Sequence, residues 1–208
     1  MNNHSGNGQL SRRERERLRH RREIINAAIH LFAKQGFDQT RLEEVASLAE
    51  FGKGTLYNYF ENKTDLLISS FETVLDDMIH LAGNKLEGVT GLRPRLRVLA
   101  NNQFELLEQN AGFIQMLISQ HRFLTQVIPE EFRPGLMQKL HTVQDLITDE
   151  MRQALERGEL REGCPKRYAT YFLGMIHSQI RAINMGLMQL DEVNVDEILD
   201  VFLEGSQA

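Results

Sequence analysis

The stretch Leu42–Lys63, LEEVASLAEFGKGTLYNYFENK, carries the pattern that decides the fold of this chain. A small apolar face made by Val45 and Ala46 predicts a short helix, and Glu50-Phe51-Gly52 predicts a break of three residues after it. A second short helix is expected over about residues 53–59. Two short helices joined by a tight turn are typical of a helix-turn-helix, which presents the start of its second helix to base edges in the DNA major groove.

The beginning of the first of these helices has a signal of its own. Thr40-Arg41-Leu42-Glu43 has the form of a capping box, in which the Thr40 hydroxyl and the Glu43 carboxylate satisfy free amide N–H groups. We therefore expect that helix to open at Thr40. The residue could serve as a cap, as a DNA contact, or as both.

The second short helix combines a small residue with several hydrogen-bonding groups. Lys53 and Thr55 would lie at its positive end, with donors for base edges or phosphates, and Gly54 would allow close approach to the bases. Tyr57 and Asn58 add a phenol and an amide. Lys63, at the start of the next helix, could neutralise one phosphate. The alternative is a purely structural role, which we expect for Leu56 and Phe60 and weigh equally for Tyr59.

Helical patterns continue on both sides of this stretch, and no segment alternates with period two for long enough to predict a sheet. We expect an all-α fold of about nine helices. Besides the two short ones, they are predicted at about residues 11–35, 63–82, 94–110, 113–121, from near Pro134 to Arg157, 165–190, and from Asn194 onward. Gly36 should end the first helix.

Composition limits the class of protein. The chain has 208 residues, of which 41% are hydrophobic and 25% charged, with no apolar run long enough for a membrane span and no secretory signal. Its single cysteine, Cys164, cannot form an internal disulfide, which favours the cytoplasm. We expect no membrane association, no metal site and no cofactor.

Charge is distributed unevenly along the chain. The net charge is -5, yet residues 1–63 hold 11 Lys and Arg against 8 Asp and Glu. Seven of these cations are arginines within residues 12–22. A basic N-terminal section on an acidic protein indicates a polyanionic partner at one end. The segment is interpreted either as a DNA-contacting extension, in the minor groove or along phosphates, or as a solvated helix.

The order of these residues resembles the TetR family of helix-turn-helix regulators over about residues 22–67. The matching positions are Ile25, Ala28, Leu31-Phe32-Ala33, Gly36-Phe37, Thr40, Val45-Ala46, KGTLYNYF at 53–60, Lys63 and Leu66. The resemblance implies that Thr40, Tyr57, Tyr59 and Lys63 anchor the DNA backbone, while Lys53, Gly54, Thr55 and Asn58 lie nearest the bases. The turn departs from the family's Ala-Gly-Val-Ser, because this chain has Ala49-Glu50-Phe51-Gly52. Because of that change, the resemblance predicts the fold better than it predicts DNA affinity and operator preference.

The resemblance also implies a domain organisation. Residues 1–10 would be a disordered tail, 11–62 a DNA-binding domain with a basic extension, and 63–208 a ligand-binding and dimerisation domain joined to it by the helix at 63–82. The last two helices would form a two-fold dimer. Candidate pocket residues, which could equally be ordinary core, are Phe104, Phe113, Met116, Leu117, His121, Phe123, Tyr168, Tyr171, Met175 and His177.

The function predicted from these features is a dimeric regulator of transcription. The family's usual behaviour implies a repressor that binds double-stranded operator DNA and leaves it when a small, predominantly apolar effector binds. Two alternatives remain: a helical small-molecule-binding protein or enzyme in which the helix-turn-helix is only scaffold, and a ligand-independent architectural protein. The sequence has no nucleophile–base pair, phosphate loop or metal-ligand spacing, so we do not expect an enzyme.

Overall fold

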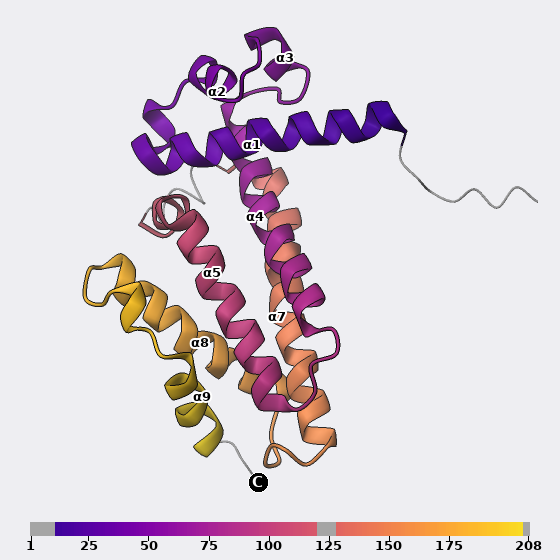
Figure 1. Ribbon diagram of the computed structural model, residues 1–208, viewed down its shortest axis with the longest axis vertical. Coiled ribbons are helices and arrows are strands. Elements are labelled where there is room, and N and C mark those ends of the chain that lie inside the picture. Colours follow the sequence, from indigo (N-terminus) through magenta and orange to yellow (C-terminus); the bar gives the residue numbers. More distant parts are fainter. Residues whose placement is uncertain (1–10, 120–127, 206–208) are drawn as a thin grey trace, which may run out of the picture. The chain divides into compact units, whose positions relative to one another are not determined.

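A computed structural model describes residues 11–119 and 128–205, and of residues 114–119 the backbone alone. Within these residues the fold contains eight α-helices and no strand (Figure 1). The helices are α1 (Arg12–Gln39), α2 (Leu42–Leu48), α3 (Lys53–Tyr57), α4 (Lys63–Leu86), α5 (Leu92–Ser119), α7 (Arg133–Glu156), α8 (Pro165–Asn184) and α9 (Val195–Glu204), with 3-10 turns at Glu130–Phe132 and Leu190–Glu192. The predicted all-α class is confirmed.

The chain divides into two compact units, residues 1–70 and residues 71–208. The division falls inside α4, which continues from one unit into the other without a loop. No helix in the described part of the chain is long and apolar enough to cross a membrane.

The first unit is built on the long helix α1. Ser11 caps it: the Ser11 hydroxyl accepts a hydrogen bond from the Glu14 amide at 3.2 Å, and the Glu14 carboxylate accepts one from the Ser11 amide at 2.7 Å. Regular helix is interrupted at Gly36, whose φ of 80° lies in the left-handed region, as the sequence predicts. One more turn follows before Thr40. The fully buried side chains of this unit include Ile24, Phe32, Leu56, Phe60 and Leu66.

In the second unit, the predicted helix boundaries change in three places. The two helices expected at 94–110 and 113–121 form one element, α5, with its kink at Asn110 rather than a break at Gly112. Helix α4 continues through Gly83 to Leu86, and α8 ends at Asn184, six residues before the predicted end. A Gly costs a helix interior only about 1 kcal/mol, which packing can offset, so a single Gly is a weak stop signal.

The core of the second unit is formed by α4, α5, α7, α8 and α9. Helix α8 contributes Phe172, Ile176 and Ile180, and α9 contributes Leu199 and Phe202. The Phe202 ring meets Phe172 edge-on, with centroids 5.5 Å apart. The apolar stripes that the sequence offers as a dimer face are therefore used inside one monomer.

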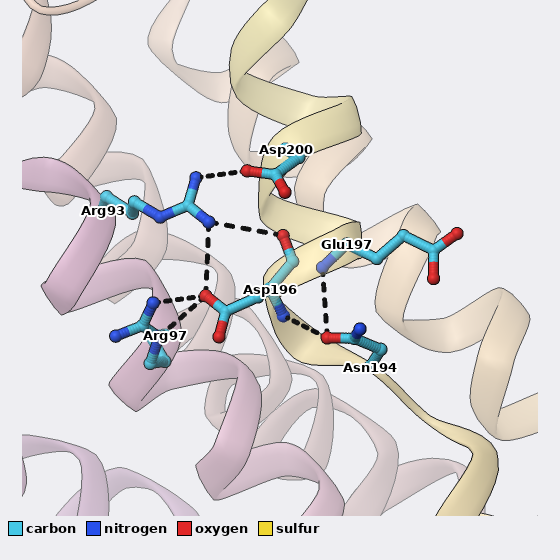
Figure 2. Close-up of polar contacts among 6 residues, drawn as sticks. All are labelled: Arg93, Arg97, Asn194, Asp196, Glu197 and Asp200. Atoms are coloured by element: carbon cyan, nitrogen blue, oxygen red, sulfur yellow. Dashed lines mark hydrogen bonds and ion pairs between the residues drawn. The ribbon is translucent and has the colours of Figure 1, made fainter.

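Polar contacts hold α9 against α5 (Figure 2). Asn194 caps α9 by accepting hydrogen bonds from the amides of Asp196 at 3.1 Å and Glu197 at 3.3 Å, as predicted. Arg93 donates to Asp200 at 2.6 Å and to Asp196 at 3.2 Å, and Arg97 also pairs with Asp196. Hydrogen bonding by Arg97, and then by Arg93, keeps the pKa of Asp196 below its ordinary value.

A second ionic contact fixes the end of α4. Arg95 forms a bidentate pair with the buried carboxylate of Glu150 on α7, with both N–O distances at 2.6 Å. The same guanidinium donates to the Leu86 carbonyl at 3.1 Å and the Val89 carbonyl at 2.7 Å. One side chain of α5 therefore links the C-terminal end of α4 to α7.

Candidate nucleic-acid interface

The turn between α2 and α3 is closed by a Schellman motif. The Phe51 amide donates to the Ala46 carbonyl at 2.8 Å, and the Glu50 amide donates to the Ser47 carbonyl at 3.1 Å. Glu50 occupies the left-handed position of this motif, with φ at 61°, and no other non-glycine residue in the described chain has positive φ. The turn is therefore made at some conformational cost, because a side chain stands where glycine is favoured.

Helix α3 exposes most of the residues predicted to read DNA. Lys53, Gly54, Tyr57 and Asn58 are exposed, whereas Leu56 is buried, as expected for a core position. The half-buried members of the predicted set are Thr55 and Tyr59, and Phe60 is buried. A Cβ on Gly54 would meet no atom within 4 Å, so the open space there lies on the outer side of the helix. The outer face of α3 is thus polar and uncovered by the protein.

Lys53 is already oriented by the protein. Its ammonium forms an ion pair with Glu43 of α2 and lies 5.9 Å from the centre of the Tyr57 ring. The hydrogen bond from Lys53 lowers the pKa of the Glu43 carboxyl, so the pair is ionised at neutral pH. Because both side chains are largely exposed, a phosphate or a base edge could compete with Glu43 for this cation.

The predicted capping box at Thr40 is wrong. Helix α2 begins one residue later, with Arg41 at the N-cap, and the Glu44 carboxylate accepts the Arg41 amide at 3.1 Å. Thr40 is instead buried, and its hydroxyl donates to the Gly36 carbonyl at 2.7 Å. Glu43, the expected partner, is paired with Lys53. The DNA contact predicted for Thr40 stays a prediction, and it would require buried hydrogen bonds to open.

Lys63 has an internal role that the sequence did not indicate. Its ammonium donates to the carbonyls of Phe37 at 2.8 Å, Asp38 at 3.1 Å and Thr40 at 3.1 Å, and it lies 4.5 Å from the centre of the Phe37 ring. An ammonium has three N–H donors, and these carbonyls use all three. The predicted phosphate contact is untested, but Lys63 joins the start of α4 to the last turn of α1 and to Thr40.

The half-buried Tyr59 packs near the N-terminal part of α1. Its hydroxyl lies 3.5 Å from Nδ1 of His20, and the His20 ring lies 4.9 Å from that of Phe51 in the turn. His20 therefore contacts both the turn before α3 and the segment that follows α3. Tyr59 keeps part of its surface exposed, so a structural and a DNA-contacting role remain compatible.

The second unit contains a narrow crevice among α4, α5 and α7, in which a water-sized molecule can reach only about 10 Å³. Its lining residues are mostly apolar: Met78, Ile79, Ala82, Leu99, Asn102, Gln103, Val143, Leu146 and Ile147. Asn102 is buried and donates to the Met78 carbonyl at 2.9 Å, while its Oδ1 has no hydrogen-bond partner among the described residues. A buried acceptor of this kind is costly unless something donates to it.

Among the predicted pocket residues whose side chains are described, none lines this crevice. Phe104, Phe113 and Tyr168 are buried in the core, and the Tyr168 hydroxyl donates to the Arg161 carbonyl at 3.1 Å. Tyr171 and His177 are exposed, and Met175 is half-buried. The side chains of Met116 and Leu117, and all of His121 and Phe123, lie outside the described residues. Sequence reasoning missed Asn102, although its place between Leu99 and Leu106 on one helical stripe was an available signal.

Comparison with known proteins gives a consistent result. Residues 24–69 match a family model described as bacterial regulatory proteins, tetR family. The fatty acid metabolism regulator protein of Bacillus subtilis (strain 168) is 24% identical over 187 residues, covering 88% of this chain and 93% of the relative.

Two solved structures share the fold. FadR from Bacillus subtilis in complex with stearoyl-CoA has a TM-score of 0.70 and 22% identity, covering 88% of this chain and 95% of that one. AibR in complex with isovaleryl coenzyme A and operator DNA has a TM-score of 0.64 and 20% identity, covering 89% and 97%.

Proposed function

This chain belongs to the TetR family of DNA-binding transcriptional regulators, and we propose that it is a cytoplasmic repressor released from its operator by an acyl-CoA. Its relatives are regulators and not enzymes, and the proposal gives the chain no catalytic activity. In this proposal, the first unit reads DNA, while the second binds the effector and a second copy of the chain.

The observation that carries DNA reading is the uncovered polar face of α3. Lys53, Tyr57 and Asn58 are exposed along one short helix that follows a tight turn. Their ammonium, phenol and amide groups can donate to phosphates and base edges. The neighbouring Leu56 is buried, so the same helix is fixed to the core while it presents these groups.

The apolar lining of the crevice in the second unit suits an acyl chain, and the crevice would have to widen to hold one. Seven of the side chains that line it are apolar, and helices can separate to lengthen such a space. The unpartnered Asn102 Oδ1 supplies one fixed acceptor, which suits the amide or hydroxyl donors of an acyl thioester carrier. Stearoyl-CoA and isovaleryl coenzyme A are the molecules bound by the two similar proteins.

Helix α4 offers a physical route between effector and DNA. Met78, Ile79 and Ala82 of α4 line the crevice, and Lys63 at the other end of the same helix holds the carbonyls that precede α2. An effector that shifts α4 would therefore disturb the support of the helix-turn-helix. The effector can shift the equilibrium between the two positions of α4 only by as much as its affinity differs between them.

The test begins by selecting DNA from a random duplex library with the full-length protein. The selected duplex is then titrated with protein in the presence of acyl-CoAs of different chain length. An effective acyl-CoA should lower DNA affinity by about 5–150-fold, the usual range of allosteric coupling. Asn102→Leu, which removes the polar group, should reduce this response and leave DNA affinity in the absence of effector unchanged.

Two results would contradict the proposal in different ways. Failure to enrich any sequence would remove the DNA-reading function. If a DNA sequence is enriched but no acyl-CoA changes the affinity of the protein for it, the DNA-reading function stands and the effector is a different molecule.

A further inference from the structure

The Arg-rich start of α1 is not accounted for by the helix-turn-helix. The family model begins at residue 24, whereas α1 is helical from Arg12 and is capped by Ser11. Seven arginines and two glutamates lie within residues 12–22. In Figure 1 this N-terminal half of α1 projects past α2 and α3.

One face of the extension continues the face that supports the helix-turn-helix. Residues 13, 17, 20 and 24 follow the i, i+4, i+7, i+11 spacing of a single helical stripe. Ile24 is fully buried in the first unit, and His20 touches Phe51 of the turn and the Tyr59 hydroxyl. Arg13 and Arg17 therefore lie on the side of α1 that α2, the turn and α3 occupy.

These two arginines differ from several of their neighbours. Arg12 pairs with Glu16 at 3.5 Å and Arg19 with Glu23 at 3.7 Å. Arg21 donates to Ser69 at 2.9 Å and lies over the Phe60 ring, so it is part of the unit's own packing. Arg13 and Arg17 are exposed and have no hydrogen bond or ion pair with any described residue.

The helical form decides between the two ways in which a basic extension can meet DNA. An α-helix with its side chains is about 10–12 Å wide, whereas the minor groove of B-DNA is about 6 Å wide. A helical extension cannot enter that groove as an extended arm does. Its arginines can still reach phosphates from outside, as point contacts that carry no sequence information.

We propose that Arg13 and Arg17 bind phosphates of the duplex beyond the base pairs read by α3. This inference rests on the proposed function, because it assumes that α3 faces DNA. From Ile24 to Arg13 the helix rises about 16 Å, at about 1.5 Å per residue. That length equals about five base pairs along a strand, at about 3.4 Å each. The extension thus widens the footprint and adds affinity without adding sequence preference.

The test compares two double variants of the full-length protein with equal net charge. Arg13→Gln/Arg17→Gln removes the proposed contacts, and Arg12→Gln/Arg19→Gln removes two arginines that lie off this face. Each is titrated, across salt concentrations, against the duplex selected by the wild-type protein, once trimmed to the selected site and once with ten flanking base pairs on each side. Circular dichroism checks that both variants keep the wild-type helix content.

On the flanked duplex, Arg13→Gln/Arg17→Gln should flatten the slope of log K against log salt by about 0.9 per lost phosphate, or about 2 per protomer. When the salt concentration rises fourfold, this variant should therefore lose about tenfold less DNA affinity per protomer than the wild type loses. On the trimmed duplex this variant should match the wild type. The Arg12→Gln/Arg19→Gln control should keep the wild-type slope on both duplexes.

Equal slopes for the wild type and Arg13→Gln/Arg17→Gln on the flanked duplex would overturn the inference while leaving the proposed function intact. Equal flattening in both double variants would overturn it as well, because a general charge effect would then suffice. A wild-type protein that enriches no sequence would instead remove the proposed function, and this inference with it.

Discussion

At the scale of single residues, Glu50 is the position where this chain departs most from local preference. It takes the left-handed conformation at the end of α2, with φ at 61°, in a motif that favours glycine. It also places a carboxylate in the turn just before the reading helix. The residue therefore has two separable effects, one on backbone energy and one on charge.

Glu50→Gly should raise the free energy of unfolding by about 0.5–1 kcal/mol, because glycine avoids the cost of the left-handed conformation while losing some chain entropy. Urea unfolding followed by circular dichroism measures this change. Glu50→Gln is the control, since it removes the charge and keeps the backbone cost. We expect both variants to bind DNA more tightly and only Glu50→Gly to be more stable. A stabilised Glu50→Gln would contradict this account.

Lys63 gives a second prediction at this scale. Lys63→Met keeps the length of the side chain but leaves the carbonyls of Phe37, Asp38 and Thr40 without their shared donor. Hydrogen bonds to a charged group contribute about 1.5–3 kcal/mol, so the variant should lose about that much stability. The salt slope of DNA binding should fall by less than one per protomer, because the ammonium donors already have partners.

Lys85→Met is the matched control for Lys63→Met. Lys85 forms an exposed pair with Glu105, and exposed pairs are worth about 0–1 kcal/mol. If Lys63→Met kept wild-type stability and lost a full unit of salt slope, Lys63 would be a phosphate contact, as the sequence alone predicts.

These residues show how far sequence reasoning could reach. The motif at 53–60 predicted the exposed face of α3 and the burial of Leu56 and Phe60, since each depends only on local helical spacing. The roles of Thr40 and Lys63 depend on carbonyls contributed by the last turn of α1, in one case 26 residues away along the chain. Residue type does not indicate such partners, so the sequence could not show that these two donors also bond within the protein.

At the scale of helices, the contact between α9 and α5 should respond to acid. Asp196 has its pKa lowered by hydrogen bonds from Arg97 and Arg93, so the folded protein binds a proton there less readily than the unfolded chain does. The stabilising contribution is fully present above the ordinary aspartate value of 3.8 and is lost as pH falls below it, through the lower pKa of the folded state.

We expect Asp196→Asn to reduce the difference in urea midpoint between pH 7 and pH 3 relative to the wild type. The control is Asp191→Asn, because Asp191 is exposed in the turn before α9 and has no ion pair with a described residue. Equal pH dependence in the wild type and Asp196→Asn would show that the ionic contact with α5 does not stabilise the fold.

The helices differ in how well the sequence predicted their ends. The end of regular helix at Gly36 and the cap at Asn194 were predicted correctly because a single residue type carries each signal. The helix at 94–110 was expected to stop before Gly112, yet α5 passes through it after a kink at Asn110. Buried side chains on both sides of that kink, Leu107 and Phe113, give the continued helix its packing.

At the scale of the whole molecule, exposed apolar residues on α8 and α9 lead us to expect a dimer. Tyr171 is 56% exposed and Val201 62% exposed, and Gly174 and Ser178 lie on the same stripe of α8 as Tyr171. Exposed apolar surface of this kind marks interaction sites, and small residues allow helices to approach closely. The buried Ile180 and Phe202 belong to the monomer core, so substituting them would test folding and not assembly.

Tyr171→Asp and Val201→Asp should each raise the dimer dissociation constant at least tenfold, which corresponds to about 1.4 kcal/mol. Sedimentation velocity at micromolar concentration measures the change. Met137→Asp serves as the control, because Met137 is an exposed apolar residue that belongs to α7 and not to α8 or α9. A dimer that tolerates both α8 and α9 substitutions but dissociates on Met137→Asp would place the interface on α7.

The passage of α4 through the boundary between the two units restricts how this regulator can be recombined with others. No loop separates the two units. A hybrid protein that combines the first unit of one regulator with the second unit of another must therefore be joined inside α4. One inserted residue would turn everything that follows by about 100° and advance it by about 1.5 Å, whereas seven would restore nearly the same orientation two turns further on. A functional hybrid of two such proteins therefore has to keep the helical register of α4, which is counted in helical turns.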